Sequence, residues 1–236
     1  MAQYDLQADR TLGTTDVDAR VTSFLRSVYS WMCAGLGVTA FVAYAVAQSP
    51  AVLSAIAANR GIYWVLLLAQ LGLVFWLSAR VHKMAPGTAS LLFLLYSGLT
   101  GLTFSFILLA FTGQSIATTF LTCATMFGAL ALYGTTTSRS LAGWGQFLFM
   151  GLVGVVIASI VGMFWHSDGL QFVISVIGVI VFTGLTAYDA QRLRVMATAM
   201  PSGQTGSYAI VGALTLYLDF INLFLMLLRF TGSRRN

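Results

Sequence analysis

The chain contains no glutamate and few charged residues of any kind. Only 8% of its 236 residues are charged and 58% are hydrophobic, whereas an ordinary soluble domain has about 25% charged residues. All acidic side chains are therefore the seven aspartates. A water-soluble fold cannot cover its surface with so few charges, so the composition favours a membrane protein. The length suits one helical bundle rather than several domains.

Cysteine is also scarce. Cys33 and Cys123 lie far apart inside apolar runs and form no Cys-x-x-Cys motif, which predicts buried, inert thiols.

The net charge of +5 could suggest a nucleic-acid partner. The basic residues, however, stand at the ends of apolar runs, as membrane topology alone requires. We therefore expect no nucleic-acid binding.

Seven apolar segments approach or exceed the length of about 20 residues that crosses a membrane. They predict an all-α membrane protein, a seven-transmembrane-helix bundle with spans at 27–48, 62–81, 88–111, 115–134, 144–165, 170–192 and 208–230. The transmembrane domain thus covers residues 27–230. Residues 1–26 are polar and predict a solvated cytoplasmic tail. Residues 231–236 form a short basic tail at the C-terminus.

The basic residues also predict an orientation. With a cytoplasmic N-terminus, the outer loops carry Arg60, and the inner side collects Arg20, Arg26, Arg80, Lys83, Arg139, Arg192 and Arg194. This distribution follows the positive-inside rule. The C-terminal residues Arg229, Arg234 and Arg235 depart from it, because seven spans place them on the outer side. The sequence leaves the side of the C-terminus open.

Two aspartates lie inside predicted spans, where an ionised side chain costs about 2.5–3.5 kcal/mol. Asp189 is late in the sixth span, and Asp219 is midway along the seventh. Each is 15 residues from Gln204, in the connecting loop, so antiparallel helices bring them to the same depth. The alternative is that each is a structural residue bonded to a neighbouring helix. Two such residues on consecutive helices favour a functional pair.

Small and polar residues share one face of the last span. They recur at steps of three and four and are Tyr208, Gly212, Thr215, Asp219, Asn222, Met226 and Arg229. A helix with such a face contacts protein or water rather than lipid, which places it at the centre of the bundle. A shorter stripe of Thr183, Thr186 and Asp189 follows the sixth span.

Two carboxylates in a low-dielectric site cannot both ionise cheaply, so the pair titrates as a unit. Asp189 and Asp219 therefore predict a pH sensor on an ion pathway. Carboxylate oxygens also suit Ca²⁺, but two are too few for tight binding. We expect transient Ca²⁺ binding at Asp189 and Asp219, with Ca²⁺ as the transported ion and no tightly bound cofactor. We expect no enzymatic activity.

Four further residues are expected to support the pair. Thr186 lies one turn before Asp189, while Thr215 and Asn222 flank the second aspartate. Arg80 ends the second span. It either pairs with Asp189 near the inner face or anchors its helix at the headgroups.

Two sequence motifs resemble those of a known family. Leu216-Tyr217-Leu218-Asp219-Phe220-Ile221-Asn222-Leu223-Phe224 closely resembles the last-helix motif of the Bax inhibitor-1 family, and Tyr188-Asp189-Ala190-Gln191 resembles its motif at the end of the sixth helix. The resemblance covers nearly the whole chain after about residue 20, and the short N-terminal tail is similar to bacterial members. It implies a seven-helix bundle in which the C-terminal helix is central, surrounded by two three-helix groups, in a bacterial inner membrane.

The resemblance also implies a function. Family members are described as pH-dependent calcium leak channels, whose aspartate pair matches Asp189 and Asp219. In some members an arginine near the end of the second helix latches to one aspartate. Ser78 occupies that position here, and Arg80 follows two residues later. Some bacterial relatives modulate a membrane-embedded AAA protease, so the expected partners are the lipid bilayer and such a protease.

Two other functions compete with a proton-gated leak. The first is a non-catalytic modulator of a membrane protease, with the polar N-terminal tail as the contact. The second is an intramembrane aspartyl protease, since that family also carries two aspartates on consecutive helices. Its second aspartate follows a Gly-x-Gly sequence, whereas Asp219 follows Tyr217-Leu218, which argues against this enzyme.

Overall fold

The computed structural model describes residues 2–80, 83–165, 167–199 and 205–235. Within these ranges the chain forms eight helices: α1 (Ala2–Ala47), α2 (Pro50–Ala58), α3 (Arg60–Arg80), α4 (Pro86–Ala110), α5 (Gly113–Thr136), α6 (Ala142–Phe164), α7 (Asp168–Ala199) and α8 (Thr205–Thr231). The prediction of an all-α fold is confirmed. Gln204, at the expected hairpin tip, lies outside the described residues.

Apolar side chains cover the outside of the bundle. Phe41, Leu121 and Phe164 expose 73%, 68% and 80% of their surfaces, although a soluble protein rarely exposes large apolar patches. Among the described residues six helices are long and apolar enough to cross a membrane: α1 from Val17 onward, α4, α5, α6, α7 and α8. The chain is therefore an integral membrane protein.

The second predicted span, 62–81, forms α3. Its described apolar stretch, Trp64–Arg80, is shorter than the six others. By length and composition, the described part of the chain thus has six spans and one shorter apolar helix. The expected number of seven is not confirmed.

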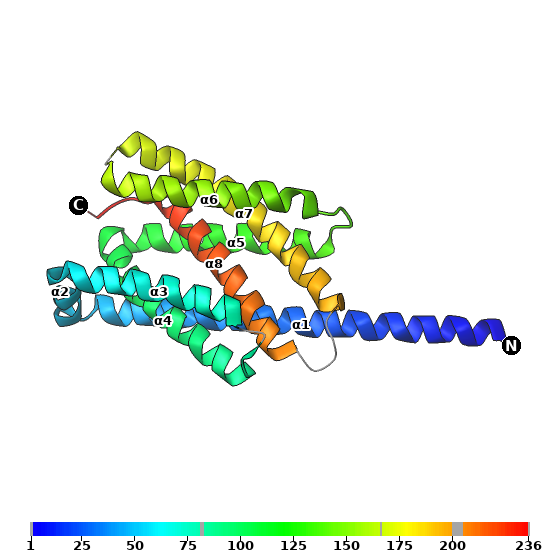
Figure 1. Ribbon diagram of the computed structural model, residues 1–236. Coiled ribbons are helices and arrows are strands. Elements are labelled where there is room, and N and C mark those ends of the chain that lie inside the picture. Colours follow the sequence, from blue (N-terminus) through cyan, green and yellow to red (C-terminus); the bar gives the residue numbers. More distant parts are fainter. Residues whose placement is uncertain (1, 81–82, 166, 200–204, 236) are drawn as a thin grey trace.

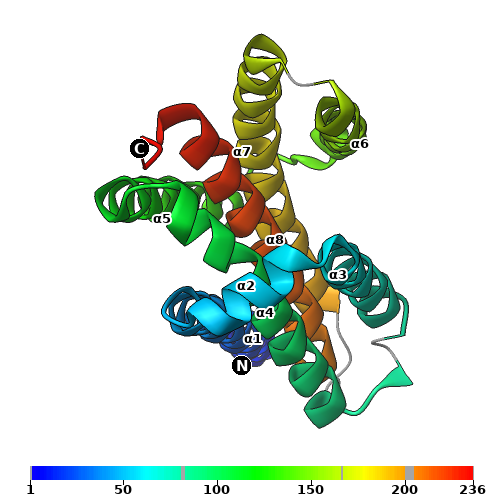
Figure 2. The same cartoon turned by 90° about the vertical axis from the view of Figure 1, so that its left-hand side faces the viewer.

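The last helix occupies the centre of the bundle, as its polar face predicts. α8 packs against α1, α4, α5 and α7 and crosses between the other helices in both views (Figure 1, Figure 2). In the most apolar stretch of α8, 72% of the residues are buried, whereas the corresponding share is 22–44% in the other five long apolar helices. Any movement of α8 therefore requires repacking against four neighbours.

The remaining long helices pack around α8 in two sets. α4 packs against α1 and α3, whereas α7 packs against α5 and α6. A contact between α1 and α7 joins the two sets. Glycines allow close approach at the centre: Gly134 of α5 meets the backbone of Ala187, and Gly178 of α7 meets Met226. Such small residues are the usual means of close helix packing in membranes.

Prolines and a threonine define several helix starts. Pro50 and Pro86 occupy the first turns of α2 and α4, where the missing N–H group costs nothing. Thr112 accepts a hydrogen bond from Ser115 N (3.3 Å) and caps α5. Pro50 thus ends the first predicted span and also starts α2, a helix that the apolar pattern does not predict.

The first predicted span, 27–48, lies almost entirely within a longer helix, α1. α1 is one helix from Ala2, and its N-terminal part projects beyond the other helices (Figure 1). The predicted boundary between residues 26 and 27 lies inside this helix, and Phe24, before that boundary, is already buried in the bundle. Cys33 is exposed while Cys123 is buried, so the prediction of two buried thiols is wrong for Cys33.

Candidate functional site

A cavity beside α8 contains both intramembrane aspartates. Its volume is about 480 Å³, and α6, α7 and α8 supply its walls. Asp189 and Asp219 are 8% and 6% exposed. The other lining residues are mainly apolar and are Gly145, Phe149, Leu152, Phe182, Leu185, Tyr188, Arg192, Thr215, Leu218 and Asn222. The two carboxyl groups thus lie in a largely apolar setting, where water cannot fully screen their interaction.

The carboxyl groups of Asp189 and Asp219 lie within hydrogen-bonding reach of each other. Because a carboxylate only accepts hydrogen bonds, this bond requires a proton on one of the two groups. Asp219 Oδ2 is buried and has no hydrogen-bond partner in the described part of the chain. A buried polar atom without a partner is rare and calls for an explanation such as a functional role or a bound water or ion. A proton on either group would allow this bond to form, and Asp219 Oδ2 is an acceptor without a partner among the described residues.

The antiparallel packing of α7 and α8 brings the pair together, at the common depth that the loop spacing predicts. Glycines hold the two helices close on either side of the aspartates. A Cβ atom on Gly178 would lie 2.7 Å from Met226 Cγ, and one on Gly212 would lie 2.8 Å from Leu193 Cδ2. A larger residue at Gly178 would require the Met226 side chain to move aside, and one at Gly212 would displace that of Leu193.

Thr215 and Asn222 also line the cavity, and each has a side-chain oxygen. Thr215 Oγ1 donates to Val211 O (3.0 Å), and Asn222 Nδ2 donates to Leu218 O (2.8 Å). The helix backbone thus takes up these donors, and the side-chain oxygens keep their capacity to accept. Together with the carboxyl groups, they supply the hard oxygen ligands that Ca²⁺ prefers.

One residue on α7 lines the cavity and a second fixes a neighbouring helix, although the sequence analysis did not single them out for these roles. Arg192 lines the cavity and interacts electrostatically with Asp189; its position three residues after the aspartate was the available signal. Gln191 accepts a hydrogen bond from Leu141 N (2.7 Å) and donates to Arg139 O (2.8 Å). It ties the start of α6 to the helix that carries Asp189.

Two predicted supporting residues lie elsewhere. Thr186 is fully buried and donates to Phe182 O (2.8 Å), and it does not line the cavity. Arg80 is exposed at the end of α3 and is also absent from the cavity wall. Asp189 interacts with Arg192 instead, so pairing with Arg80 does not occur in this structure.

The described residues contain no cluster of three or more His, Cys, Asp or Glu side chains that could hold a metal ion. A Ca²⁺ site at the aspartates would have only two carboxylates with the oxygens of Thr215 and Asn222 near them. This set is smaller than the six to eight oxygens of a tight calcium site.

Comparison with known proteins settles the family. A family model described as "Inhibitor of apoptosis-promoting Bax1" matches residues 21–236. The chain belongs to the Bax inhibitor-1 family. Within this family the chain is similar to the inner membrane protein YbhL of Escherichia coli K12, with 50% identity over 92% of this chain and 94% of the relative.

Other bacterial relatives span the same length. A protein of Borreliella burgdorferi is 45% identical over 90% of this chain and 93% of its own, and one of Caulobacter vibrioides is 39% identical over 98% and 95%. Both are named as uncharacterized proteins. The family assignment therefore covers almost the whole chain, including both aspartate-bearing helices.

Proposed function

We propose that this Bax inhibitor-1 family member is a pH-dependent Ca²⁺ leak channel that is gated by protonation of the Asp189–Asp219 pair. The observation that carries the proposal is the buried contact between the two carboxyl groups on the wall of a cavity. We propose no enzymatic activity.

The proposed gating follows from the shared proton. While one carboxyl group is protonated, a hydrogen bond holds α7 to α8. Loss of that proton leaves two carboxylates at close range, which repel each other strongly in a low-dielectric site. A cation between them relieves the repulsion. A rise in pH therefore replaces a proton with Ca²⁺ and weakens the contact between α7 and the central helix.

We further propose a topology and location for this channel. α3 crosses the membrane as a seventh span, since it packs along α4 and carries an apolar stretch up to Arg80. The N-terminus is cytoplasmic, as the basic residues favour. The name of the Escherichia coli relative places that protein in the inner membrane, and we propose the same membrane for this chain. Seven spans then put Arg235 on the outer side.

The test is Ca²⁺ flux through the purified protein in proteoliposomes, measured from pH 6 to pH 8. We expect flux that rises with pH, because deprotonation creates the cation site. Protein-free liposomes are the control for passive leakage. Absence of flux above that background at every pH would contradict the channel function.

A second proposed function is modulation of a membrane-embedded AAA protease. The observation that favours it is the N-terminal part of α1, which projects beyond the bundle (Figure 1) and so offers a helix for a partner. Deleting residues 1–16 should remove a co-purifying protease while Ca²⁺ flux persists, because the described span begins at Val17. Unchanged co-purification would show that the projecting helix is not the contact.

A further inference from the structure

A second group of cavities lies on the other side of α8 from the aspartates. The aspartate cavity touches Leu218 and Asn222, whereas one cavity of this group touches Phe220 and Phe224. At 100° per residue these pairs point in roughly opposite directions from the helix axis. The second group lies between α1 and α5, which belong to different sets of helices, and it requires an explanation separate from the ion site.

Two of these cavities adjoin each other, and together they are called the slot. Their volumes are about 350 and 600 Å³, and both are lined by Ala40, Tyr44 and Ile116. Along α1 the slot runs from Leu36 to Gln48, which corresponds to about 18 Å of helix. The hydrocarbon core of a bilayer is about 30 Å thick. The slot therefore has the length of the hydrocarbon layer of a single leaflet.

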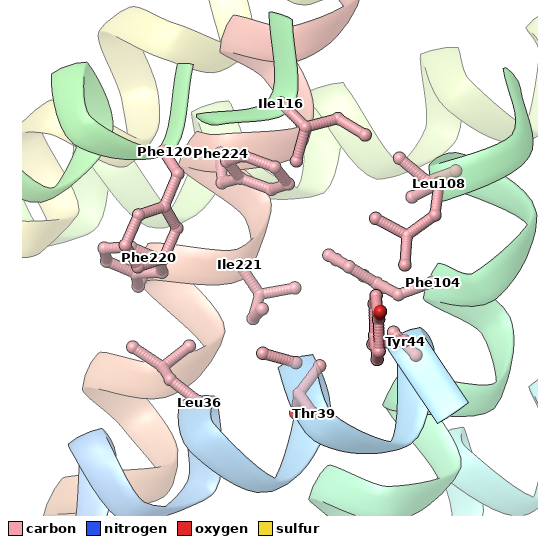
Figure 3. Close-up of a pocket in the computed structure, with 13 residues that line it drawn as sticks. Leu36, Thr39, Tyr44, Phe104, Leu108, Ile116, Phe120, Phe220, Ile221 and Phe224 are labelled. Atoms are coloured by element: carbon pink, nitrogen blue, oxygen red, sulfur yellow. The ribbon is translucent and has the colours of Figure 1, made fainter. Parts of the chain in front are cut away.

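The inner part of the slot is apolar. Figure 3 shows Phe104, Ile116 and Ile221 around the open space, from α4, α5 and α8. The hydroxyl of Thr39 also lines it but is already bonded, to Tyr217 Oη (2.6 Å) and Ser97 O (2.9 Å). No wall residue of this part contributes a charge. Its surface suits a hydrocarbon chain.

The other end of the slot is cationic and held in place. Arg235 lines it together with Gln48. The C-terminal segment is fixed by backbone bonds to the α4–α5 connection, from Thr112 N to Ser233 O (3.1 Å) and from Arg235 N to Ala110 O (2.9 Å). The backbone of Arg235 is thus anchored at the end of the slot that lies away from its apolar part.

We propose that the slot binds an anionic phospholipid from the bilayer, with one acyl chain between α1 and α5 and the phosphate group against Arg235. Charge complementarity selects an anionic headgroup over a zwitterionic one. The site also accounts for a basic residue on the outer side in the topology proposed above, where the positive-inside rule predicts few.

The experiment is native mass spectrometry of the full-length protein in a neutral detergent, titrated with phosphatidylglycerol or with phosphatidylcholine of identical chains. We expect one bound phosphatidylglycerol per protein, with an affinity about tenfold higher than that of phosphatidylcholine. Arg235→Gln should remove this preference. Ala40→Phe should weaken binding of both lipids, because it fills the slot from an exposed position.

Ala45→Phe is the matched control, since Ala45 is also exposed on α1 but lines neither cavity of the slot. It should bind both lipids as the wild type does. Equal binding of the two lipids by the wild type would overturn the proposal. A preference that survives Arg235→Gln, or binding that survives Ala40→Phe, would overturn it as well. Lipid binding is read without flux, so this result is independent of the channel function.

Discussion

Asp219→Asn is expected to abolish the pH dependence of Ca²⁺ flux. Asparagine has nearly the same size, and its Nδ2 can donate to Asp189 at every pH. The variant therefore keeps α7 bonded to α8 as the protonated pair does. We expect flux that changes about tenfold between pH 6 and pH 8 in the wild type to become low and flat in the variant. The measurement is Ca²⁺ flux in proteoliposomes across that range.

Two further variants make this result specific. Asp189→Asn should give the same flat profile, because either residue alone cannot form the proton-sharing pair. Arg80→Gln should leave the wild-type profile intact, since Arg80 is exposed and does not line the cavity. Retention of the wild-type profile by Asp219→Asn would place the sensor elsewhere, and a flat profile in Arg80→Gln would indicate a latch that this structure does not contain.

The sequence predicted the depth of the aspartates better than the direction in which each side chain points. Equal spacing from the loop brings Asp189 and Asp219 to one level, because the rise per residue is constant in both helices. The direction depends on how each helix is rotated about its axis, and packing decides that rotation. On α7 the cavity wall includes Phe182, Leu185 and Asp189. Thr186 points about 100° away from Leu185 and is fully buried in the protein.

Composition and spacing also could not predict contacts between distant segments. Gln191 looked like part of a short motif, yet its side chain bonds the backbone of Arg139 and Leu141, which lie about 50 residues earlier. The short helix α2 begins at Pro50. A proline at this position is equally typical of the end of the preceding helix. The apolar pattern identified the long helices, because lipid exposure requires apolar residues all along them.

Gly134→Ala is expected to destabilise the bundle. A Cβ atom at Gly134 would overlap the backbone carbonyl oxygen of Ala187 on α7. A backbone atom cannot move aside as the end of a flexible side chain can, so α5 and α7 must separate. We expect a loss of about 1–3 kcal/mol and a fall in melting temperature of roughly 3–10 °C. Thermal unfolding in detergent, followed by near-ultraviolet circular dichroism, measures it.

Gly128→Ala on the same helix is the matched control, because no atom lies within 4 Å of a Cβ atom there. It should leave the melting temperature unchanged or raise it slightly, since alanine is the better helix former by about 1 kcal/mol. Equal melting temperatures for the two variants would show that α5 and α7 do not approach as closely as described. Since Ala187 precedes Asp189 by two residues, separation of α5 from α7 also moves the aspartate pair. Gly134→Ala should therefore shift the pH profile of flux, whereas Gly128→Ala should not.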